Sequence, residues 1–345
     1  MVLPAEIATS HLLAGSPLVS VLMLTYNHGD TLAQAIESVV SQRCDFAFEL
    51  LIGEDASTDQ TLRVARSYQE KYPAIIRIVH FDKNVGMNNN FSTLVKLSRG
   101  KYLAFCEGDD YWCDSTKISK QVACFAANIH IGVVHSDWVC SRENAGLWCV
   151  DWSDRAHKNV TANMLSGDLF KFFYSPRILR TCTLMIKKSL AEEIENSILR
   201  STHYKFVDTV YASFLTSKSL VGYMPEVTAV YRISKNSALR SGKKAKVSFL
   251  LSALEFDGEA RDFFTGRHDY PMEYRWEICV GIIFHALMVG DLKAVLRALN
   301  SIKTSYSVKS FFAAGFCSLN NHYPFFCWRY LLSNPYGVRD NRRVP

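Results

Sequence analysis

Short apolar runs alternate with amphipathic stretches through the first 130 residues. A short apolar run between polar turns predicts a buried strand, and such runs lie at residues 18–24, 48–52, 75–79 and 101–106. Between them the apolar residues follow helical spacing, as Leu32, Ile36 and Val39 do. Helices are predicted at residues 31–42, 57–68, 90–97 and 115–127, the second with Ser57 and Gln60 at capping-box spacing. This alternation predicts an α/β domain whose mainly parallel sheet is covered by helices on both faces.

The pattern changes after a further predicted strand at 131–135. Residues 139–177 are rich in Trp and Asp and predict loops. Strands are then predicted at 181–186, 220–224 and 228–233, and helices at 208–215, 247–264, 273–289 and 291–302, with shorter amphipathic pieces at 311–316 and 323–332. Ser, Lys and Gly cluster at 236–246 and indicate a boundary. The predicted parts are a loose leader at 1–16, a domain at 17–240 that divides after residue 138, and a helical C-terminal region at 241–345.

Composition and charge narrow the class of protein. With 48% hydrophobic and 21% charged residues, the 345-residue chain is typical of a folded globular protein. Its net charge of +6 is mild and is concentrated in the second half. The residues responsible are Lys243, Lys244, Lys246, Arg339, Arg342 and Arg343. They form either an ordinary solvated surface or a basic rim that attracts phosphates or a membrane surface; no nucleic-acid partner is expected.

The sequence also predicts where the protein works. No apolar window is long enough for a transmembrane helix. Residues 1–16 contain no Lys or Arg and do not resemble a secretory signal. The ten cysteines are scattered singly, which is typical of a reduced compartment. We therefore expect a cytoplasmic protein, with peripheral contact at the membrane face left open.

Three carboxylates crowd the end of the strand predicted at 101–106. Glu107, Asp109 and Asp110 lie within four residues. Like charges this close raise one another's pKa unless a cation or hydrogen-bond donors compensate, and hard metal ions prefer oxygen ligands. Ligands of open α/β sheets bind beyond the carboxyl ends of the strands. The cluster therefore predicts a metal site; the alternative is an acidic turn that caps the next helix.

Two other strands end in residues suited to a nucleotide. Tyr26 follows the first strand and can stack on a base, while Asp55 follows the second and can accept the N3–H of uracil or thymine. Guanine also has a donor edge, so GDP stays open. Together with the acidic cluster these residues predict a nucleoside-diphosphate site. No G-x-G-x-x-G follows the first strand, which disfavours a nicotinamide dehydrogenase. The loop at 25–30 lacks the glycines and basic residues expected of a nucleotidyltransferase.

Several motifs follow one another in the first part of the chain. They are Val19-Ser20-Val21 through Thr25-Tyr26-Asn27, Ala35-Ile36-Glu37-Ser38-Val39 with Ser41-Gln42, Ile52 through Asp59, and Gly100 through Trp112. In this order they resemble the family 2 glycosyltransferases, which have the GT-A fold, and the resemblance covers residues 17–235. The resemblance implies a GT-A-like fold with a nucleotide-binding half at 17–138 and an acceptor half at 139–240. It also implies a nucleotide-sugar donor and Mn²⁺ or Mg²⁺ as cofactor.

The resemblance assigns roles to the residues of the predicted site. It implies that Asp109 contacts the metal and that Glu107 lies near the ribose or a metal-bound water, although the family more often has Asp at the first position of its D-x-D motif. It places Tyr26 and Asp55 on the base. The implied supporting residues are Thr25, Asp110 and Arg232. Arg232 is suited to a phosphate or to a neighbouring carboxylate.

A transferase of this kind also needs a general base for the acceptor hydroxyl. Phe206-Val207-Asp208-Thr209, followed by Gly222 to Glu226 and Val230 to Arg232, resembles the family segment in which an Asp at a helix start is the base. The alternative is that Asp208 only caps its helix. His135 with Asp137 is a weaker candidate for the acceptor side. His80 and His203 show no ligand spacing with other His or Cys, so no structural zinc is predicted.

The favoured interpretation is a metal-dependent inverting glycosyltransferase. It would move a sugar from a UDP- or dTDP-sugar to a hydroxyl of a glycan or lipid-linked acceptor, in the synthesis of a surface polysaccharide. The alternative is a catalytically degenerate scaffold that binds a glycan or a partner. Asp55, Asp109 and Asp208 are all present and favour the enzyme.

Overall fold

The computed structural model describes residues 5–7, 15–144, 146–175, 177–201, 203–233 and 242–303. The chain divides into two compact units. The first contains residues 1–202 and 206–234, and the second contains 203–205 and 235–345. Sequence analysis places the boundary at 236–246. The predicted helical pieces at 311–316 and 323–332 and the basic residues near the C-terminus lie outside the described residues.

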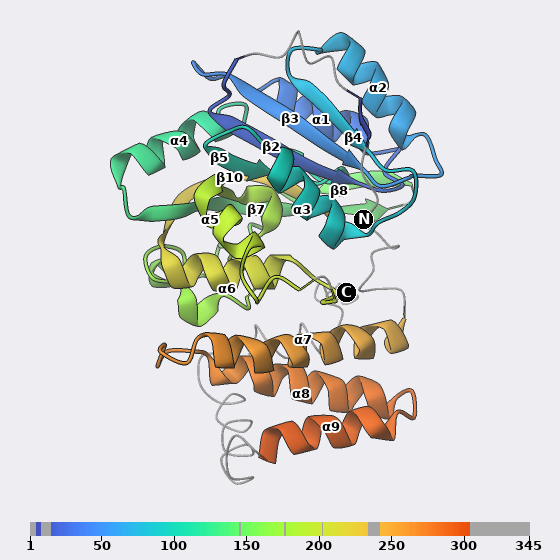
Figure 1. The fold of residues 1–345 in the computed structure, drawn as a ribbon, viewed down its shortest axis with the longest axis vertical. Coiled ribbons are helices and arrows are strands. Elements are labelled where there is room, and N and C mark those ends of the chain that lie inside the picture. The colour runs from blue at the N-terminus through green and yellow to red at the C-terminus, as the bar shows by residue number, and fades with distance from the viewer. Residues whose placement is uncertain are drawn as a thin grey trace, which may run out of the picture. The chain divides into compact units, whose positions relative to one another are not determined.

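A mixed β-sheet forms the centre of the first unit (Figure 1). Among the described residues its order is β1-β4-β3-β2-β5-β9-β7-β10-β6, and β8 pairs with β7. The strands are β1 (Ala5–Ile7), β2 (Val19–Thr25), β3 (Phe48–Glu54), β4 (Ile76–His80), β5 (Tyr102–Phe105), β6 (Tyr111–Trp112), β7 (Ile131–Asn144), β8 (Leu147–Val150), β9 (Met185–Lys187) and β10 (Leu220–Ile233).

The sheet is parallel in its first half and mixed in its second. Strands β4, β3, β2 and β5 are parallel neighbours, as the alternating pattern predicts. Strand β9 is antiparallel to both β5 and β7, and β6 is antiparallel to β10. Parallel neighbours need a crossover connection, whereas β6 follows β5 after a loop without one. The predicted α/β class is confirmed, and the strands β1, β6, β8 and β9, each antiparallel to a neighbour, make the sheet mixed.

Helices cover both faces of this sheet. The α-helices of the unit are α1 (Leu32–Val40), α2 (Thr61–Lys71), α3 (Met87–Leu97), α4 (Lys117–Ala127), α5 (Lys188–Glu195) and α6 (Asp208–Lys218). On one face Val21 and Met23 of β2 share a buried core with Ile36 of α1. On the other face Phe91 of α3 stacks on Phe105 of β5, with ring centroids 5.6 Å apart. The predicted helix layers are therefore present.

Long-range pairing changes several predicted elements. Within the predicted loose leader 1–16, residues 5–7 form a strand that pairs with β4. Within the predicted loops at 139–177, β7 continues to Asn144 and forms a hairpin with β8. The predicted strands at 220–224 and 228–233 form one strand, β10, with register shifts around Pro225, a residue that has no N–H for the ladder. None of these pairings is visible in local sequence.

Two shorter predictions are also wrong. The predicted strand at 181–186 begins instead as a 3₁₀ turn, Thr181–Thr183, and only Met185–Lys187 is a strand. The predicted capping box is not formed, because α2 begins at Thr61. Near the start of α2, the Oδ1 of Asp59 instead accepts the Thr61 N–H at 2.9 Å. Ser57 is used elsewhere, in the loop described below.

A buried ionic cluster lies near the amino ends of β2 and β3. The carboxylate of Glu49 accepts hydrogen bonds from Ser20 Oγ at 2.6 Å, Arg77 Nη1 at 3.0 Å and Arg99 Nε at 2.7 Å. Burial opposes ionisation of Glu49, but bonds from Ser20 and Arg99 hold its pKa below the ordinary value. Buried charges need such partners. Because all members are paired, the cluster has a structural role.

The second unit is helical, as predicted. It contains α7 (Lys243–Phe263), α8 (Met272–Leu287) and α9 (Leu292–Lys303), which run side by side (Figure 1). Asp257 of α7 is fully buried and forms ion pairs with Arg261 of the same helix and Arg275 of α8. These pairs fix α8 on α7. None of the described helices has the length and apolar content needed to cross a bilayer.

Candidate functional site

Three loops meet at the carboxyl end of β2. The Asp55 N–H, after β3, donates to the Thr25 carbonyl at 3.1 Å, and the Gly108 N–H, after β5, donates to the Leu24 carbonyl at 2.9 Å. Thr31 Oγ1 donates to the Gly108 carbonyl at 2.9 Å. The structure therefore brings together Thr25, Asp55 and the acidic loop, which the sequence places at the ends of three separate strands.

The loops after β2 and β3 are fixed to each other around Tyr26. Asn27 Oδ1 accepts the Thr58 N–H at 2.9 Å, and the Asn27 N–H donates to Ser57 Oγ at 3.0 Å. Asn27 and Ala56 have left-handed φ angles of 55° and 57°, a conformation that non-glycine residues adopt at a cost. Tyr26 is 45% exposed on this rigid support. Its ring is therefore accessible to a ligand.

Asp55 is held in one orientation by the loop that follows β4. Its Oδ1 accepts the Val85 N–H at 2.7 Å and its Oδ2 accepts the Gly86 N–H at 3.0 Å. Burial raises the pKa of Asp55, and the Glu54 charge adds to this shift, while the two N–H groups oppose it. A carboxylate oxygen has more than one lone pair, so these bonds orient Asp55 and still leave acceptor capacity.

Asp110 is buried and is bonded to a neighbouring strand. Its Oδ1 accepts the backbone N–H of Arg232, on β10, at 2.8 Å, and the residue is buried. Burial raises the pKa of Asp110 well above the ordinary value, and the charges of Asp109 and Glu107 add to the shift. Asp110 therefore connects the acidic loop to β10.

Glu107 is a partly buried acid whose charge is not fully compensated. Burial raises its pKa to about 7, with the Asp109 charge adding, Arg180 opposing and Asp208 adding. Its Oε2 is buried and lacks a hydrogen-bond partner among the described residues, as do Thr25 Oγ1 and His28 Nδ1. Buried polar atoms are normally paired. Three such atoms at one edge of the sheet indicate that a ligand completes their bonding.

Gly108 lets the acidic loop approach the loop after β2. A Cβ at this position would lie 2.7 Å from His28 Nδ1 and 2.8 Å from Thr25 Oγ1. Both distances are shorter than ordinary contacts, so any side chain would push the loops apart. The glycine between Glu107 and Asp109 is therefore required by packing.

The described residues contain one group with the spacing of a three-residue metal site. It consists of His203, Glu255 and Glu259, whose ligand atoms lie within 4.8 Å of one another on the exposed surface of the second unit. Sequence spacing did not reveal this neighbourhood. Among the described residues, Glu107, Asp109 and Asp110 do not have this spacing.

Arg232 is a structural connector. Its side chain is 4% exposed. Its Nη1 donates to the backbone carbonyl of Asp109 at 3.0 Å, and its Nη2 donates to Gln34 of α1. The guanidinium lies 4.9 Å from the ring centroid of Tyr111 and 5.4 Å from that of Trp148. Sequence analysis left a phosphate or a carboxylate as its partner; the structure shows a carbonyl and an amide.

Asp208 is the first residue of α6 and is exposed. Its Oδ1 accepts the Thr209 N–H at 2.8 Å, and Val207, at the cap position, provides no side-chain bond. Because the Asp208 charge contributes to raising the pKa of Glu107, the two carboxylates lie within electrostatic reach. The structure thus brings Asp208 toward the acidic loop from about 100 residues away in sequence.

Arg180 is a further residue near Glu107 that was not predicted from the sequence, because no motif surrounds it. Its guanidinium lies 4.6 Å from the Trp138 ring centroid and 4.3 Å from that of Tyr231. The Arg180 charge opposes the rise in the pKa of Glu107. Strands β7 and β10 supply the two rings, so only tertiary pairing assembles this arrangement.

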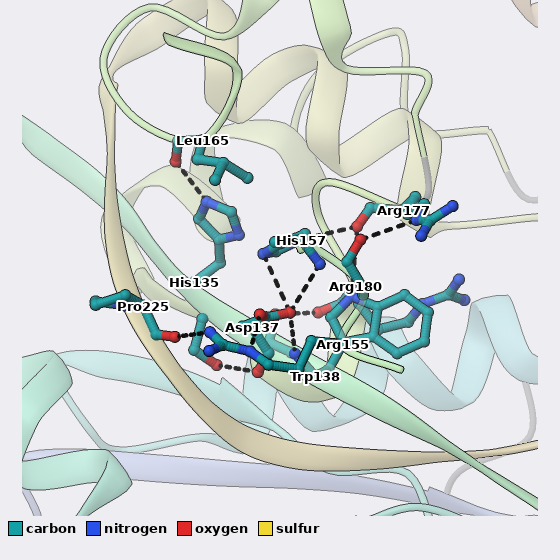
Figure 2. Close-up of polar contacts among 12 residues, drawn as sticks. His135, Asp137, Trp138, Arg155, His157, Leu165, Arg177, Arg180 and Pro225 are labelled. Carbon is teal, nitrogen blue, oxygen red and sulfur yellow. Dashed lines mark hydrogen bonds and ion pairs between the residues drawn. The ribbon is translucent and has the colours of Figure 1, made fainter. Parts of the chain in front are cut away.

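His135 and Asp137, considered for the acceptor side, lie in a buried network (Figure 2). His135 Nε2 donates to the Leu165 carbonyl at 2.6 Å. Asp137 accepts Arg155 Nε at 2.8 Å and the His157 N–H at 3.0 Å. These bonds attach residues 151–180 to β7. These contacts favour a structural role for His135 and Asp137 over a role in binding the acceptor.

The network predicts an acid-sensitive fold. Burial lowers the pKa of His135 to about 3. Between about pH 6.5 and 3 the imidazole of His135 binds a proton in the unfolded chain but not in the native chain. The free energy of unfolding therefore decreases by about 1.4 kcal/mol for each unit by which the pH is lowered. We expect His135→Gln to lose this component, measured by denaturant unfolding at about pH 7.5 and 5.5. The exposed His130→Gln is the control, and equal slopes in all three proteins would contradict the expectation.

Comparison with known proteins places these features in a family. The sequence matches "Glycosyl transferase family 2" over residues 20–192, half of the chain. An uncharacterized Mycobacterium tuberculosis protein is 40% identical over 104 residues, which are 30% of each chain. The dTDP-rhamnosyl transferase RfbG of Shigella flexneri is 25% identical over 66% of this chain and 76% of its own. The matched part of the mycobacterial relative is thus less than a third of its length.

The fold also has a match among solved structures. Mannosyltransferase PcManGT from Pyrobaculum calidifontis superposes with a TM-score of 0.56 at 16% identity, over 92% of this chain and 84% of that chain. This likeness confirms the predicted GT-A-like fold with its helical extension. From the family match and the fold together, the chain is a member of glycosyl transferase family 2.

Proposed function

We propose that this protein is a metal-dependent inverting glycosyltransferase that moves a sugar from a nucleotide sugar to an acceptor hydroxyl. The observation that carries the proposal is the meeting of Tyr26, Asp55 and the acidic loop at the carboxyl end of β2. In an open α/β sheet this edge is where ligands bind. Each residue there has the chemistry that one part of a nucleoside diphosphate requires.

The donor base would lie between the first two loops. The exposed Tyr26 ring offers a stacking surface, and Asp55, held by Val85 and Gly86, offers an acceptor to an N–H of the base. We favour UDP or dTDP, because both pyrimidines have an N3–H. RfbG is named for dTDP-rhamnose, and PcManGT was solved with GDP-Man and Mn²⁺. These names support a nucleotide sugar in general, and the base is left to experiment.

The acidic loop fits a divalent cation such as Mn²⁺ or Mg²⁺. Glu107 has a buried unpaired oxygen and a pKa raised to about 7 by burial and by Asp109. A cation would relieve both the repulsion and the missing bond. Asp109 would hold the ion, with Glu107 near the ribose or a metal-bound water. When bound, such an ion neutralises charge on a leaving diphosphate.

Asp208 would act as general base. Its carboxylate is exposed, and the Thr209 N–H bonds to Oδ1 and orients it. In the proposed reaction it accepts the proton of the acceptor hydroxyl as the oxygen attacks the anomeric carbon from the face opposite the diphosphate, which inverts that centre. Arg232 would position Asp109 through its carbonyl, and Thr25 and Asp110 would support the acidic loop.

The setting of the reaction follows from the proposed donor. We propose a glycan or lipid-linked acceptor, as in surface polysaccharide synthesis, and a cytoplasmic enzyme that contacts the membrane peripherally. The competing hypothesis is a scaffold that binds a glycan without turnover. The buried unpaired polar atoms of Thr25, His28 and Glu107 support a site that takes a nucleotide ligand.

Calorimetric titration tests the proposed function. UDP, dTDP, GDP and NAD are titrated into the full chain, each with Mn²⁺ and again with chelator. We expect one nucleoside diphosphate to bind, and chelator to weaken its binding, because Asp109 would hold an ion whose charge favours the diphosphate. Binding of NAD alone, or of none of the four, would overturn the proposal. Binding without release of the sugar from the matching nucleotide sugar would favour the scaffold.

A further inference from the structure

The hairpin of β7 and β8 carries exposed apolar side chains beside the candidate site. In its register Glu143 faces Trp148 and Asn144 faces Leu147. Trp148 is 38% exposed and Leu147 is 71% exposed. Single exposed apolar side chains are common on protein surfaces, so what sets Trp148 apart is the contact of its ring with Arg232. The question is which ligand the Trp148 indole contacts.

Two successive contacts connect Trp148 to the acidic loop. The Arg232 guanidinium lies 5.4 Å from the centroid of the Trp148 ring, and its Nη1 donates to the Asp109 carbonyl at 3.0 Å. Arg232 itself is 4% exposed and is bonded to Gln34. A cation against an aromatic ring is attractive. Trp148 is therefore held by a rigid side chain that also holds the backbone of the proposed metal ligand.

An indole in this position suits a sugar ring. A pyranose has a face of weakly positive C–H groups, and the face of an aromatic ring is negative, so the two attract when stacked. Trp gives a large rigid contact area at low entropic cost. Because Arg232 lies against the ring and part of the ring is exposed, a sugar can stack there without displacing the side chain.

We propose that Trp148 is the stacking platform for the sugar of the acceptor. This inference rests on the proposed function. Two sugar rings meet when the acceptor of such a reaction is itself a glycan, one from the donor and one from the acceptor. The donor loops follow β2, β3 and β5, whereas the hairpin extends β7, beyond β9 in the sheet. The hairpin therefore approaches the acidic loop from the side that the nucleotide does not use.

The test compares Trp148→Ala with Trp152→Ala. Trp152 is 55% exposed and lies four residues along the chain, so it is a matched control for the loss of an exposed indole. The probes are methyl glycosides of common hexoses, with binding followed by saturation-transfer NMR in the presence of diamagnetic Mg²⁺ and a saturating nucleoside diphosphate. We expect Trp148→Ala to raise the glycoside Kd by about five- to tenfold. Trp152→Ala should match the wild type, and Trp148→Phe should retain most of the affinity.

Each other outcome overturns the inference. It fails if the wild type binds no glycoside, if Trp148→Ala binds like the wild type, or if both alanine variants lose affinity equally. Reduced binding to anionic lipid vesicles without a change in glycoside affinity would show a membrane contact instead. If Trp148→Ala weakens only the affinity for the nucleotide sugar, the Trp148 ring contacts the donor instead. Failure of the wild type to bind any nucleoside diphosphate would overturn the proposed function itself.

Discussion

Asp208→Asn is expected to reduce the rate of sugar transfer by about two to four orders of magnitude, the loss typical of removing a general base. The amide is isosteric with the carboxylate, so the Thr209 N–H keeps an acceptor while the proton of the acceptor hydroxyl loses its base. Affinity for the nucleoside diphosphate should not change. The measurement is initial rate with the donor that the titration identifies, together with calorimetry.

The alternative role of Asp208 predicts a different result. An acid in the first turn of a helix stabilises it by about 0.3–1 kcal/mol. If this is the only role of Asp208, Asp208→Asn would lower the unfolding temperature and leave the rate of sugar transfer unchanged. Asp114→Asn is the matched control, because Asp114 also accepts a backbone N–H next to a helix start, that of Thr116 at 2.8 Å, just before α4. Full transfer activity in Asp208→Asn would remove Asp208 from catalysis.

Asp109→Ala is expected to weaken binding of the nucleoside diphosphate by about a hundredfold in the presence of Mn²⁺, since outer-shell changes at metal sites already cost about 10–100-fold. The physical reason is loss of the proposed protein ligand to the ion. The Arg232 bond goes to the Asp109 backbone carbonyl, so the loop itself should remain in place. Calorimetry with and without Mn²⁺ measures the effect.

Chelator provides the internal control for this variant. Without metal, wild type and Asp109→Ala should bind the nucleotide with the same weak affinity. Asp45→Ala removes an exposed carboxylate from the loop before β3, at the opposite edge of the sheet, and should bind as the wild type does. If Asp109→Ala binds as tightly as the wild type with Mn²⁺, Asp109 is not the metal ligand.

Much of the first unit was predictable because its signals are local. Leu32, Ile36 and Val39 recur at the period of a helix that the structure contains as α1. The residues of the predicted site directly follow the strands, and the carboxyl ends of parallel strands lie at one edge of the sheet. Tyr26, Asp55 and the acidic loop therefore followed from position in the chain. Their roles in catalysis and binding are still predictions.

Other features required the folded chain. Residues 5–7 join the sheet only because the edge of β4 has unpaired backbone groups. Arg180 meets Trp138 and Tyr231 across β7 and β10. No spacing rule connects residues so far apart, because side-chain contacts between strands depend on sheet order and register.

The amino-acid sequence by itself determined the α/β succession, the helical C-terminal part and the carboxylates at the ends of the strands, since each depends on periodicity or on neighbours in the chain. Only the tertiary structure decided that Asp110 bonds to β10, that Arg232 holds both the Asp109 backbone and Trp148, and that Asp208 lies within electrostatic reach of Glu107. Those relations depend on which strands pair and in what register, and the free energy that selects this arrangement comes from the buried core as a whole.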